Sequence, residues 1–363
     1  MEKFAETYEL NETQIEQSRL VELSYPGIKL ARNVTFDDIW TLFLDSGFLY
    51  PEKIEKLQPV MPELQATVRA LLNANGHLLA TAVVRDEHKL DAQISMLRAY
   101  EQTWMVHHLA ALPLTSRDTN ASAQVTLALT YYGQLRSDIH WAKMFFRPNN
   151  PWPSRVFGGF FKLIKDKPTC DYRVFHYLTA STNGPSPELS DQVQVRSAKE
   201  QDLSLIEDWF TSRGRTVELM ANDLRQSKFS LPRLSQDYFN AGLDRHRECI
   251  VAERNGRIAG FALLEISSIG LNFSELTNAF TVRMIEEDPE SRLALILAAK
   301  QRYGELGRLQ CVALEEDEDL SSFVAAGFTH GKDYGCGTYH RDHFADLEEY
   351  IITLFSVRRR RHA

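Results

Sequence analysis

The chain has 363 residues, of which 44% are hydrophobic and 25% charged, with a net charge of −8. This is the composition of an ordinary globular protein, and the length predicts two domains or one large one. The acidic balance argues against a general nucleic-acid-binding protein, which usually carries a basic face. Only 18 glycines and 13 prolines are present, so collagen-like and low-complexity classes are excluded.

The cysteines and the hydropathy pattern indicate in which cellular compartment the protein is expected. Cys170, Cys249, Cys311 and Cys336 form no CxxC pair, and scattered thiols suit a reducing cytoplasm. The Glu-rich segment 1–25 lacks the apolar core of a signal peptide. No apolar run approaches the ~20 residues that a membrane helix needs. We therefore expect a cytoplasmic protein without a membrane span.

In chain order, the first half predicts alternating strands and helices. Thr35-Phe-Asp-Asp38 has the pattern of a helix cap, with apolar residues at 39, 42 and 43 facing inward. Asn75-Gly76 is a hairpin signal, although Val68–Leu72 before it is more typical of a helix. The later elements are a strand, a helix and two further strands: Thr103–Leu112, Ala121–Leu135, His140–Phe146 and Tyr172–Leu178.

The second half predicts the same β-α-β-β-β-α-β-α-β order. Ser197 and Glu200 form an S-x-x-E capping box after a short strand at 193–195. An apolar stripe at helical spacing follows, and Asn255-Gly256 lies between two strand-like runs. The remaining elements are Leu276–Ile285, Pro289–Leu306, Leu309–Leu314 and Gly335–His340.

Three short anchors recur in the same order in both halves, which indicates a tandem repeat. They are Arg32…Asp38 with Arg196…Asp202, Asn75-Gly76 with Asn255-Gly256, and Gly159-Phe160 with Gly327-Phe328. A segment rich in Gly, Pro and Ser separates the copies and has the composition of a linker. The expected division is a helical extension (1–26), a first domain (27–180), a linker (181–190), a second domain (191–341), and an amphipathic helix with a basic tail (342–363).

This order, with the Arg-x5-Asp opening, the Asn-Gly turn and the late Gly-Phe, resembles the GCN5-related N-acetyltransferase (GNAT) superfamily. The resemblance implies an α/β (α+β) fold of two tandem GNAT-like domains, each a mixed, mostly antiparallel sheet flanked by helices. It also implies acetyl-CoA, or another acyl-CoA, as co-substrate at the start of the helix after the fourth strand. There a Q/R-x-x-G-x-G/A loop wraps the pyrophosphate, and a tyrosine four residues before the late glycine returns a proton to the thiolate.

The second half departs from that pattern. Its loop, residues 286–292, has no glycine and carries four carboxylates. Asp288 is a natural N-cap and Pro289 a natural first helical residue, so the helix is expected to cap itself. Phe323 stands at the tyrosine position and cannot transfer a proton. We therefore expect no conventional CoA binding in the second half.

The first half is more permissive. Its loop contains R-x-x-N-x-S, and asparagine tolerates positive φ better than most residues. The candidate phosphate ligands are Thr115, Ser116, Arg117, Asn120 and Ser122. The alternative is a polar loop in which Asn120 is an N-cap. Arg155, again not a tyrosine, stands four residues before Gly159.

His107 and His108 lie on the strand leading into this loop. Neighbours on a strand face opposite sides, so one of the two should face the cleft. Histidine is suited to deprotonating an acceptor amine near neutral pH. The alternative is a histidine pair that is satisfied by hydrogen bonds and has no catalytic role.

Two other segments are candidates for ligands or metals. The Pro-fixed segment 147–155 offers Arg147, Asn150, Trp152 and Arg155 for an anionic or planar ligand, or it is a rigid connector. His340 and His343 have no third ligand spaced nearby, so no metal is predicted.

These observations leave two functions open. One is an acyl-CoA-dependent N-acyltransferase that uses only the first half and a small-molecule amine. The other is a non-catalytic GNAT-fold protein that binds a small anionic ligand, such as a nucleotide, or a protein partner. The apolar helix at 344–355 packs on the body or on a second subunit, as in a homodimer. The tail Arg358–Arg361 is solvated or docked on the acidic surface of the chain, or it contacts nucleic acid, anionic lipid or an acidic partner, or it holds a ligand such as a nucleotide. Nucleic acid is not expected as the main partner of a chain with this acidic balance.

Overall fold

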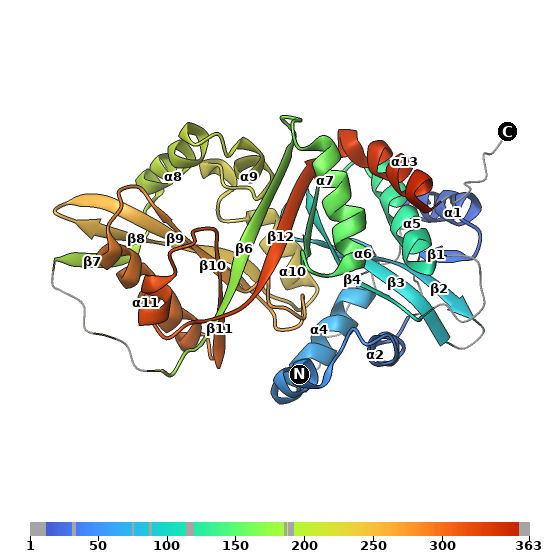
Figure 1. The fold of residues 1–363 in the computed structure, drawn as a ribbon, viewed down its shortest axis with the longest axis horizontal. Helices are drawn as coiled ribbons and strands as arrows, with labels where there is room; N and C mark the ends of the chain where they lie inside the picture. Colours follow the sequence, from blue (N-terminus) through green and yellow to red (C-terminus); the bar gives the residue numbers. More distant parts are fainter. Residues whose placement is uncertain are drawn as a thin grey trace.

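The computed structural model describes residues 12–30, 34–74, 76–86, 89–113, 120–184, 187 and 192–355. Within these residues, twelve strands form one mixed sheet in the order β1-β2-β3-β4-β5-β12-β6-β11-β10-β9-β8-β7 (Figure 1). The strands are β1 (Ile28–Leu30), β2 (Leu79–Asp86), β3 (Lys89–Arg98), β4 (Thr103–Ala111), β5 (Trp141–Phe146), β6 (Cys170–Ser181), β7 (Val193–Ser197), β8 (Arg245–Arg254), β9 (Arg257–Ser267), β10 (Ala279–Met284), β11 (Gln310–Glu315) and β12 (Thr329–His340).

The two ends of this sheet have the same pairing pattern. β1 to β4 are antiparallel and β4 is parallel to β5, while β7 to β10 are antiparallel and β10 is parallel to β11. The predicted α/β class and the repeated order are therefore present. The repeat lies in the strand pairings rather than in any long stretch of shared sequence.

The last strands of the two halves are exchanged, which the sequence analysis did not predict. β6 pairs with β11 and β12, both from the second half, and β12 also pairs with β5 of the first half. Figure 1 shows β6 and β12 crossing the centre of the molecule side by side. One continuous sheet thus replaces the two separate sheets that we expected, because alternation within a strand does not specify a partner so distant in sequence.

Helices cover both faces of the sheet. The face that we call the α5 face carries α1 (Glu12–Ser24), α5 (Ala121–Leu135), α7 (Gly159–Ile164), α11 (Pro289–Glu305), α12 (Ser321–Ala325) and α13 (Phe344–Phe355). The α4 face carries α2 (Phe36–Asp45), α3 (Pro51–Leu57), α4 (Met61–Asn73), α8 (Glu200–Ser212), α9 (Thr216–Ala221) and α10 (Pro232–Asn240). Short turns are η1 (Gln58–Val60), α6 (Pro151–Pro153), η2 (Ser154–Gly158), η3 (Gln226–Lys228) and η4 (Arg341–His343). No described helix is long and apolar enough to cross a bilayer.

Two of the local sequence signals are confirmed and one is wrong. The Thr35 hydroxyl accepts from the Asp38 amide at 3.1 Å, and the Asp38 carboxylate accepts from the Thr35 amide at 2.9 Å, which completes the predicted box at α2. Asn255 and Gly256 have φ of +52° and +74°, as a tight hairpin turn requires. The Ser197 box is wrong, because Ser197 still belongs to β7 and the cap is the Lys199 amide donating to Asp202 at 2.7 Å.

Two repeat anchors do not correspond in space. Gly76 (φ +79°) follows α4, whereas the hairpin equivalent to β8–β9 is β2–β3, which closes between Asp86 and Lys89. Gly159 is helical with φ −65°, whereas Gly327 (φ +84°) follows the end of α12. Short Asn-Gly and Gly-Phe strings satisfy different local needs, so their recurrence was coincidental. Arg32 and Asn75 lie outside the described residues.

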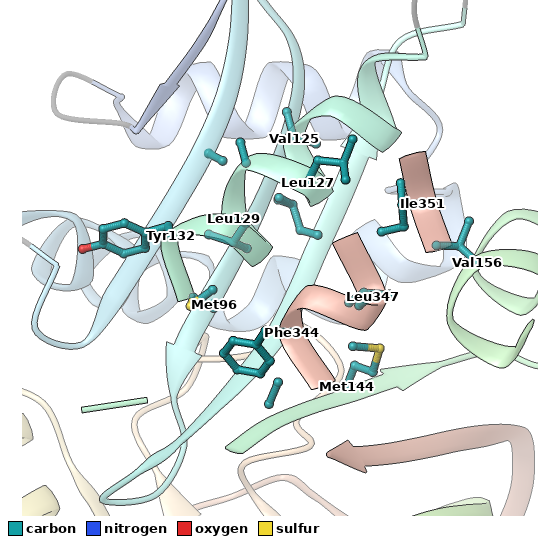
Figure 2. Close-up of a cluster of buried hydrophobic side chains, with 14 of the residues drawn as sticks. Met96, Val125, Leu127, Leu129, Tyr132, Met144, Val156, Phe344, Leu347 and Ile351 are labelled. Carbon is teal, nitrogen blue, oxygen red and sulfur yellow. The ribbon is translucent and has the colours of Figure 1, made fainter. Parts of the chain in front are cut away.

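The C-terminal helix α13 packs on the body of the same chain. Phe344, Leu347 and Ile351 are buried in the core beneath α5. Figure 2 shows these side chains among Val125, Leu127 and Leu129 of α5 and Met96 and Met144 of the sheet. Of the two alternatives expected for this helix, packing on the body of the chain is the one observed. The tail Arg358–Arg361 lies outside the described residues.

A glycine fixes how closely α7 approaches the exchanged strand. A Cβ atom at Gly337 of β12 would overlap the Phe161 ring of α7. We expect Gly337→Ala to lower the free energy of unfolding by about 1–3 kcal/mol, because the ring must leave its position in a packed core. Urea denaturation measures this loss. Gly158→Ala is the control, since its Cβ would meet Phe146 at an ordinary 3.5 Å; equal losses in both variants would refute the explanation.

Candidate functional site

The two histidines on β4 lie side by side rather than on opposite faces. The register between β3 and β4 shifts after Gln93, and His108 has a left-handed φ of +56°. As a result the rings of His107 and His108 stack, with centroids 4.0 Å apart. The expectation of alternating orientation is wrong here, because an extra residue at a β-bulge breaks the two-residue period.

The histidine pair is enclosed by aromatic rings and by a loop of the second half. Phe43, Phe48 and Phe273 surround His108, whose Nε2 accepts from the Phe273 amide at 3.3 Å. The side-chain amide of Asn272 donates through Nδ2 to His107 Nδ1 at 3.4 Å. Burial lowers the pKa of His107 to about 3 and that of His108 well below its usual value. Both rings are neutral and weakly basic, and their catalytic role stays a prediction.

The predicted phosphate loop is only partly described. Thr115, Ser116 and Arg117 lie outside the described residues. Asn120 is the N-cap of α5, and its side-chain oxygen accepts from the Ala123 amide at 3.0 Å. The Ser122 carbonyl accepts from Thr126 Oγ1 at 2.7 Å. The capping role of Asn120 is thus confirmed, and contact with CoA phosphates stays a prediction.

β4 and β5 separate directly before this loop. They pair only from Thr103 with Trp141 to Val106 with Met144, and β4 then runs on to Ala111. Beyond Met144, β5 continues beside β12. The edge of β4 that faces this opening therefore has no β5 partner past Val106 among the described strands.

The corresponding helix start in the second half is occupied by its own side chains. Asp288 is the N-cap of α11 and Pro289 its first residue, as predicted. The Asp288 carboxylate accepts from Ser291 Oγ and pairs with Arg254 at 2.6 Å. Arg254 also reaches Glu290 at 3.2 Å. Because these carboxylates stand at its N-terminus, α11 begins in surroundings that repel phosphate.

The Pro-fixed segment 147–155 packs against α13. Trp152 stacks on Phe355 with centroids 6.0 Å apart, and the Arg155 guanidinium lies 5.7 Å from the same ring. Asn150 is an exposed residue that precedes α6. Arg147 Nε and Trp152 Nε1 are buried without a hydrogen-bond partner in the described part of the chain. A ligand role for this segment stays a prediction.

A polar cavity that the sequence did not predict lies on the α4 face, where the two halves meet. The cavity encloses about 70 Å³. β4 and β5 of the first half and α9, β8, β9 and β10 of the second contribute to its wall. Its polar lining residues are Tyr100, Lys143, Glu218, Asn222, Arg245, Glu265, Thr277 and Thr281.

Glu265 is the anionic centre of this cavity. Its carboxylate pairs with Arg247 at 2.8 Å and Arg245 at 2.7 Å, and it accepts from the Tyr100 hydroxyl at 3.2 Å. Burial alone would raise the pKa of Glu265, but Arg247 and Arg245 outweigh it and hold the pKa at about 2. Glu265 is therefore ionised near neutral pH.

Lys143 is the cation of the cavity that has no carboxylate partner. Its Nζ donates to Asn222 Oδ1 at 2.9 Å, and no described carboxylate lies within ion-pair distance. Burial would lower the pKa of Lys143, but Tyr100 and the more distant carboxylates Glu218 and Glu265 raise it overall. Lys143 therefore stays protonated, with donors free for a carbonyl or an anion.

Comparison with known proteins finds a likeness of structure only. No family model and no curated protein matches the sequence. Solved GNAT structures match the chain over most of its length. A tandem GNAT protein from the clavulanic acid biosynthesis pathway is 10% identical, covers 79% of this chain and 95% of its own, and has a TM-score of 0.41. A GCN5-related N-acetyltransferase from Sphaerobacter thermophilus is 11% identical, covers 74% of this chain and 82% of its own, and has a TM-score of 0.41. A Drosophila protein is 11% identical, covers 86% of this chain and 98% of its own, and has a TM-score of 0.47.

Proposed function

We propose that the chain is an acyl-CoA-dependent N-acyltransferase in which the first half binds the acyl donor and the central cavity receives the amine. The observation that carries this is the position of the cavity beside the β4–β5 opening. Met105 and Lys143 are register partners at the paired end of these strands, and both line the cavity. His107 is two residues beyond Met105 on β4. A donor lying along the opening would bring its thioester to the cavity wall.

The donor is expected to use the unpaired edge of β4 and the start of α5. An extended thioester arm can hydrogen-bond to the β4 backbone past Val106. Its diphosphate would lie near the N-terminus of α5, where the helix dipole and the first-turn N–H groups that the Asn120 cap does not use favour an anion. Arg117 adds a cation to this loop. The carboxylates at the start of α11 disfavour a second donor in the other half.

The chemistry is the transfer of an acyl group from sulfur to nitrogen. The amine nitrogen attacks the thioester carbonyl, a C–N bond forms, the C–S bond breaks, and the proton lost by the amine balances the one gained by the thiolate. The protonated Lys143 would stabilise the negative charge that develops on the carbonyl oxygen. His107 and His108 stay our candidates for the proton acceptor, although their low basicity makes them weak ones.

That low basicity favours a second candidate function. In this alternative the chain is a non-catalytic binding protein, which holds a small anion or carbonyl compound in the cavity through Lys143. The replacement of the expected tyrosine by Arg155 in one half and by Phe323 in the other favours the same reading.

Binding of acetyl-CoA tests the donor site. We expect calorimetry to show that Arg117→Glu weakens binding at least tenfold, because a charge of the wrong sign replaces a phosphate partner. The matched charge change Glu287→Arg, at the start of α11, should leave binding unchanged. Equal losses in both variants, or no binding by the wild type, would refute the donor site.

Turnover separates the two functions. We expect the wild type to release free thiol from acetyl-CoA in the presence of amines. Lys143→Met should retain acetyl-CoA binding but lose about 10²–10³-fold in kcat, as for removal of a donor to an oxyanion. Bound acetyl-CoA without thiol release across a panel of primary amines would favour the binding protein.

A further inference from the structure

Two histidines and an aspartate converge on the central strand pair, away from the cavity. Asp333 Oδ1 lies 2.9 Å from His176 Nδ1 and 2.8 Å from His330 Nε2. The candidate ligand atoms of the three residues all lie within 4.8 Å of one another. Phe175 lines the cavity, so its neighbour His176 points to the opposite, α5 face of β6. The cluster is therefore separate from the site described above.

A β-bulge assembles this cluster. His176 of β6 lies directly across from Asp333 of β12. His330 and Asp333 are three residues apart, so in a regular strand they would point to opposite faces. The register shifts between His330 and Lys332, and this shift turns both side chains to the face of His176. The bulge thus brings three ligand-type side chains to one point.

We propose that His176, His330 and Asp333 bind one divalent transition-metal ion of the Zn²⁺ type. Two imidazole nitrogens and one carboxylate oxygen suit Zn²⁺, Co²⁺ or Ni²⁺ better than Mg²⁺ or Ca²⁺. Ligands around a tetrahedral Zn²⁺ lie about 3.3 Å apart. Asp333 Oδ1 is 2.9 and 2.8 Å from the two nitrogens, and all the ligand atoms lie within 4.8 Å of one another, so rotation of the three side chains can bring them around one ion. His330 and Asp333 are 44% and 45% exposed, which gives the ion access and leaves a position for water.

Glu318 lies beside this arrangement, outside the ligand set. Its carboxylate lies 3.7 Å from His176 Nε2. When Nδ1 of a histidine binds a metal, the ring proton is on Nε2, and a carboxylate there fixes the tautomer and strengthens the ligand. His176 thus presents Nδ1 to Asp333 and to the ion, and Nε2 to Glu318, whose side chain is 97% exposed and lies beyond hydrogen-bond distance.

The ion would join the two halves of the chain. His176 comes from β6 of the first half, and His330 and Asp333 come from β12 of the second (Figure 1). Binding to the folded state alone stabilises that state, so Zn²⁺ is expected to raise the Tm of the full chain. This role is independent of acyl transfer and holds whether or not the chain binds acyl-CoA.

Calorimetric titration of the chelator-stripped full chain with Zn²⁺ tests the site. We expect one ion per chain in the wild type and in His246→Gln, a control histidine that also lies beside a carboxylate, Glu248, at 3.7 Å. His176→Gln and Asp333→Asn should abolish this binding and the rise in Tm. Excess Mg²⁺ should not compete.

Two measurements guard against misfolding and against binding by cysteines. Circular dichroism of the metal-free variants shows whether they fold, and His330→Gln replaces any variant that does not. The absorption of bound Co²⁺ should show d–d bands without a thiolate charge-transfer band. A wild type that binds no Zn²⁺, folded variants that bind it like the wild type, or a thiolate band would overturn the site.

Discussion

Glu265→Gln is expected to lower the free energy of unfolding by roughly 3–5 kcal/mol, as for a buried ion pair that loses one partner. The side chains of Arg245 and Arg247 are 1% and 0% exposed, so neither cation can turn to water when the carboxylate is removed. Arg247 also donates to the Asn222 carbonyl at 2.7 Å, which fixes it in place. The variant therefore leaves two buried positive charges without their anion.

The loss should depend on pH in a direction that identifies its cause. The pKa of Glu265 is about 2 in the folded state, below its ordinary value of 4.5. A carboxylate with a depressed pKa contributes stability above its unfolded pKa and loses it as the pH falls toward the folded pKa. The difference between wild type and Glu265→Gln should thus be full at pH 7 and should shrink from about pH 4.5 downward.

Urea denaturation of both proteins at pH 7, 5 and 3.5 measures this difference. Glu305→Gln is the control, because Glu305 forms an exposed pair with Arg302 on one helix. Changes at exposed sites of this kind stay within about 0.5 kcal/mol. A loss in Glu265→Gln that matches the control, or that persists undiminished at pH 3.5, would contradict the assignment.

The features that the sequence predicted correctly are local ones. The Thr35 cap, the Asn255-Gly256 turn and the Asn120 cap each depend on residues within three or four positions of one another. Helix α5 spans Ala121–Leu135, the range predicted from its pattern. Such signals succeed because the hydrogen bonds that they describe close within a single turn.

The cavity and the metal cluster depend on contacts between distant segments. Lys143 and Asn222 are 79 positions apart, and His176 and Asp333 are 157 apart. One signal was present in the sequence: Arg245, Arg247 and Glu265 place charges on strands that are otherwise buried. A charge at an inward position of a strand requires a partner, and this requirement marks a polar site before its members are known.

The bulges show a second limit. At His108 and after His330, one additional residue reverses the direction of the side chains, so counting by twos along the sequence assigns them to the wrong face. Nothing in the residues themselves marks His108 as left-handed. Both histidine clusters, the pair on β4 and the one on β6 and β12, lie at these bulges. A bulge redirects side chains toward one point, so a two-residue period assigns the wrong face at the positions where the clusters form.

The exchange of β6 and β12 leads to the last prediction, that the two halves fold only together. In a fragment of residues 1–184, β6 would lack β11 and β12, and β5 would lack β12. Long unpaired strand edges promote aggregation. We expect fragments 1–184 and 192–363 to be insoluble or unfolded when each is expressed alone, and to form a stable one-to-one complex when they are expressed together.

A protease site placed between residues 184 and 192 tests the same idea in the intact protein. After cleavage, the two pieces should elute as one species in gel filtration and should part only in denaturant, since the ladders of β6 with β11 and of β5 with β12 cross from one piece to the other. The same cleavage in a protein with independent domains would release two folded pieces. A monomeric, folded fragment 1–184 would contradict this prediction. It would mean that β6 can pair with β5 of its own half, and that the fold does not require the pairing of β6 with the second half.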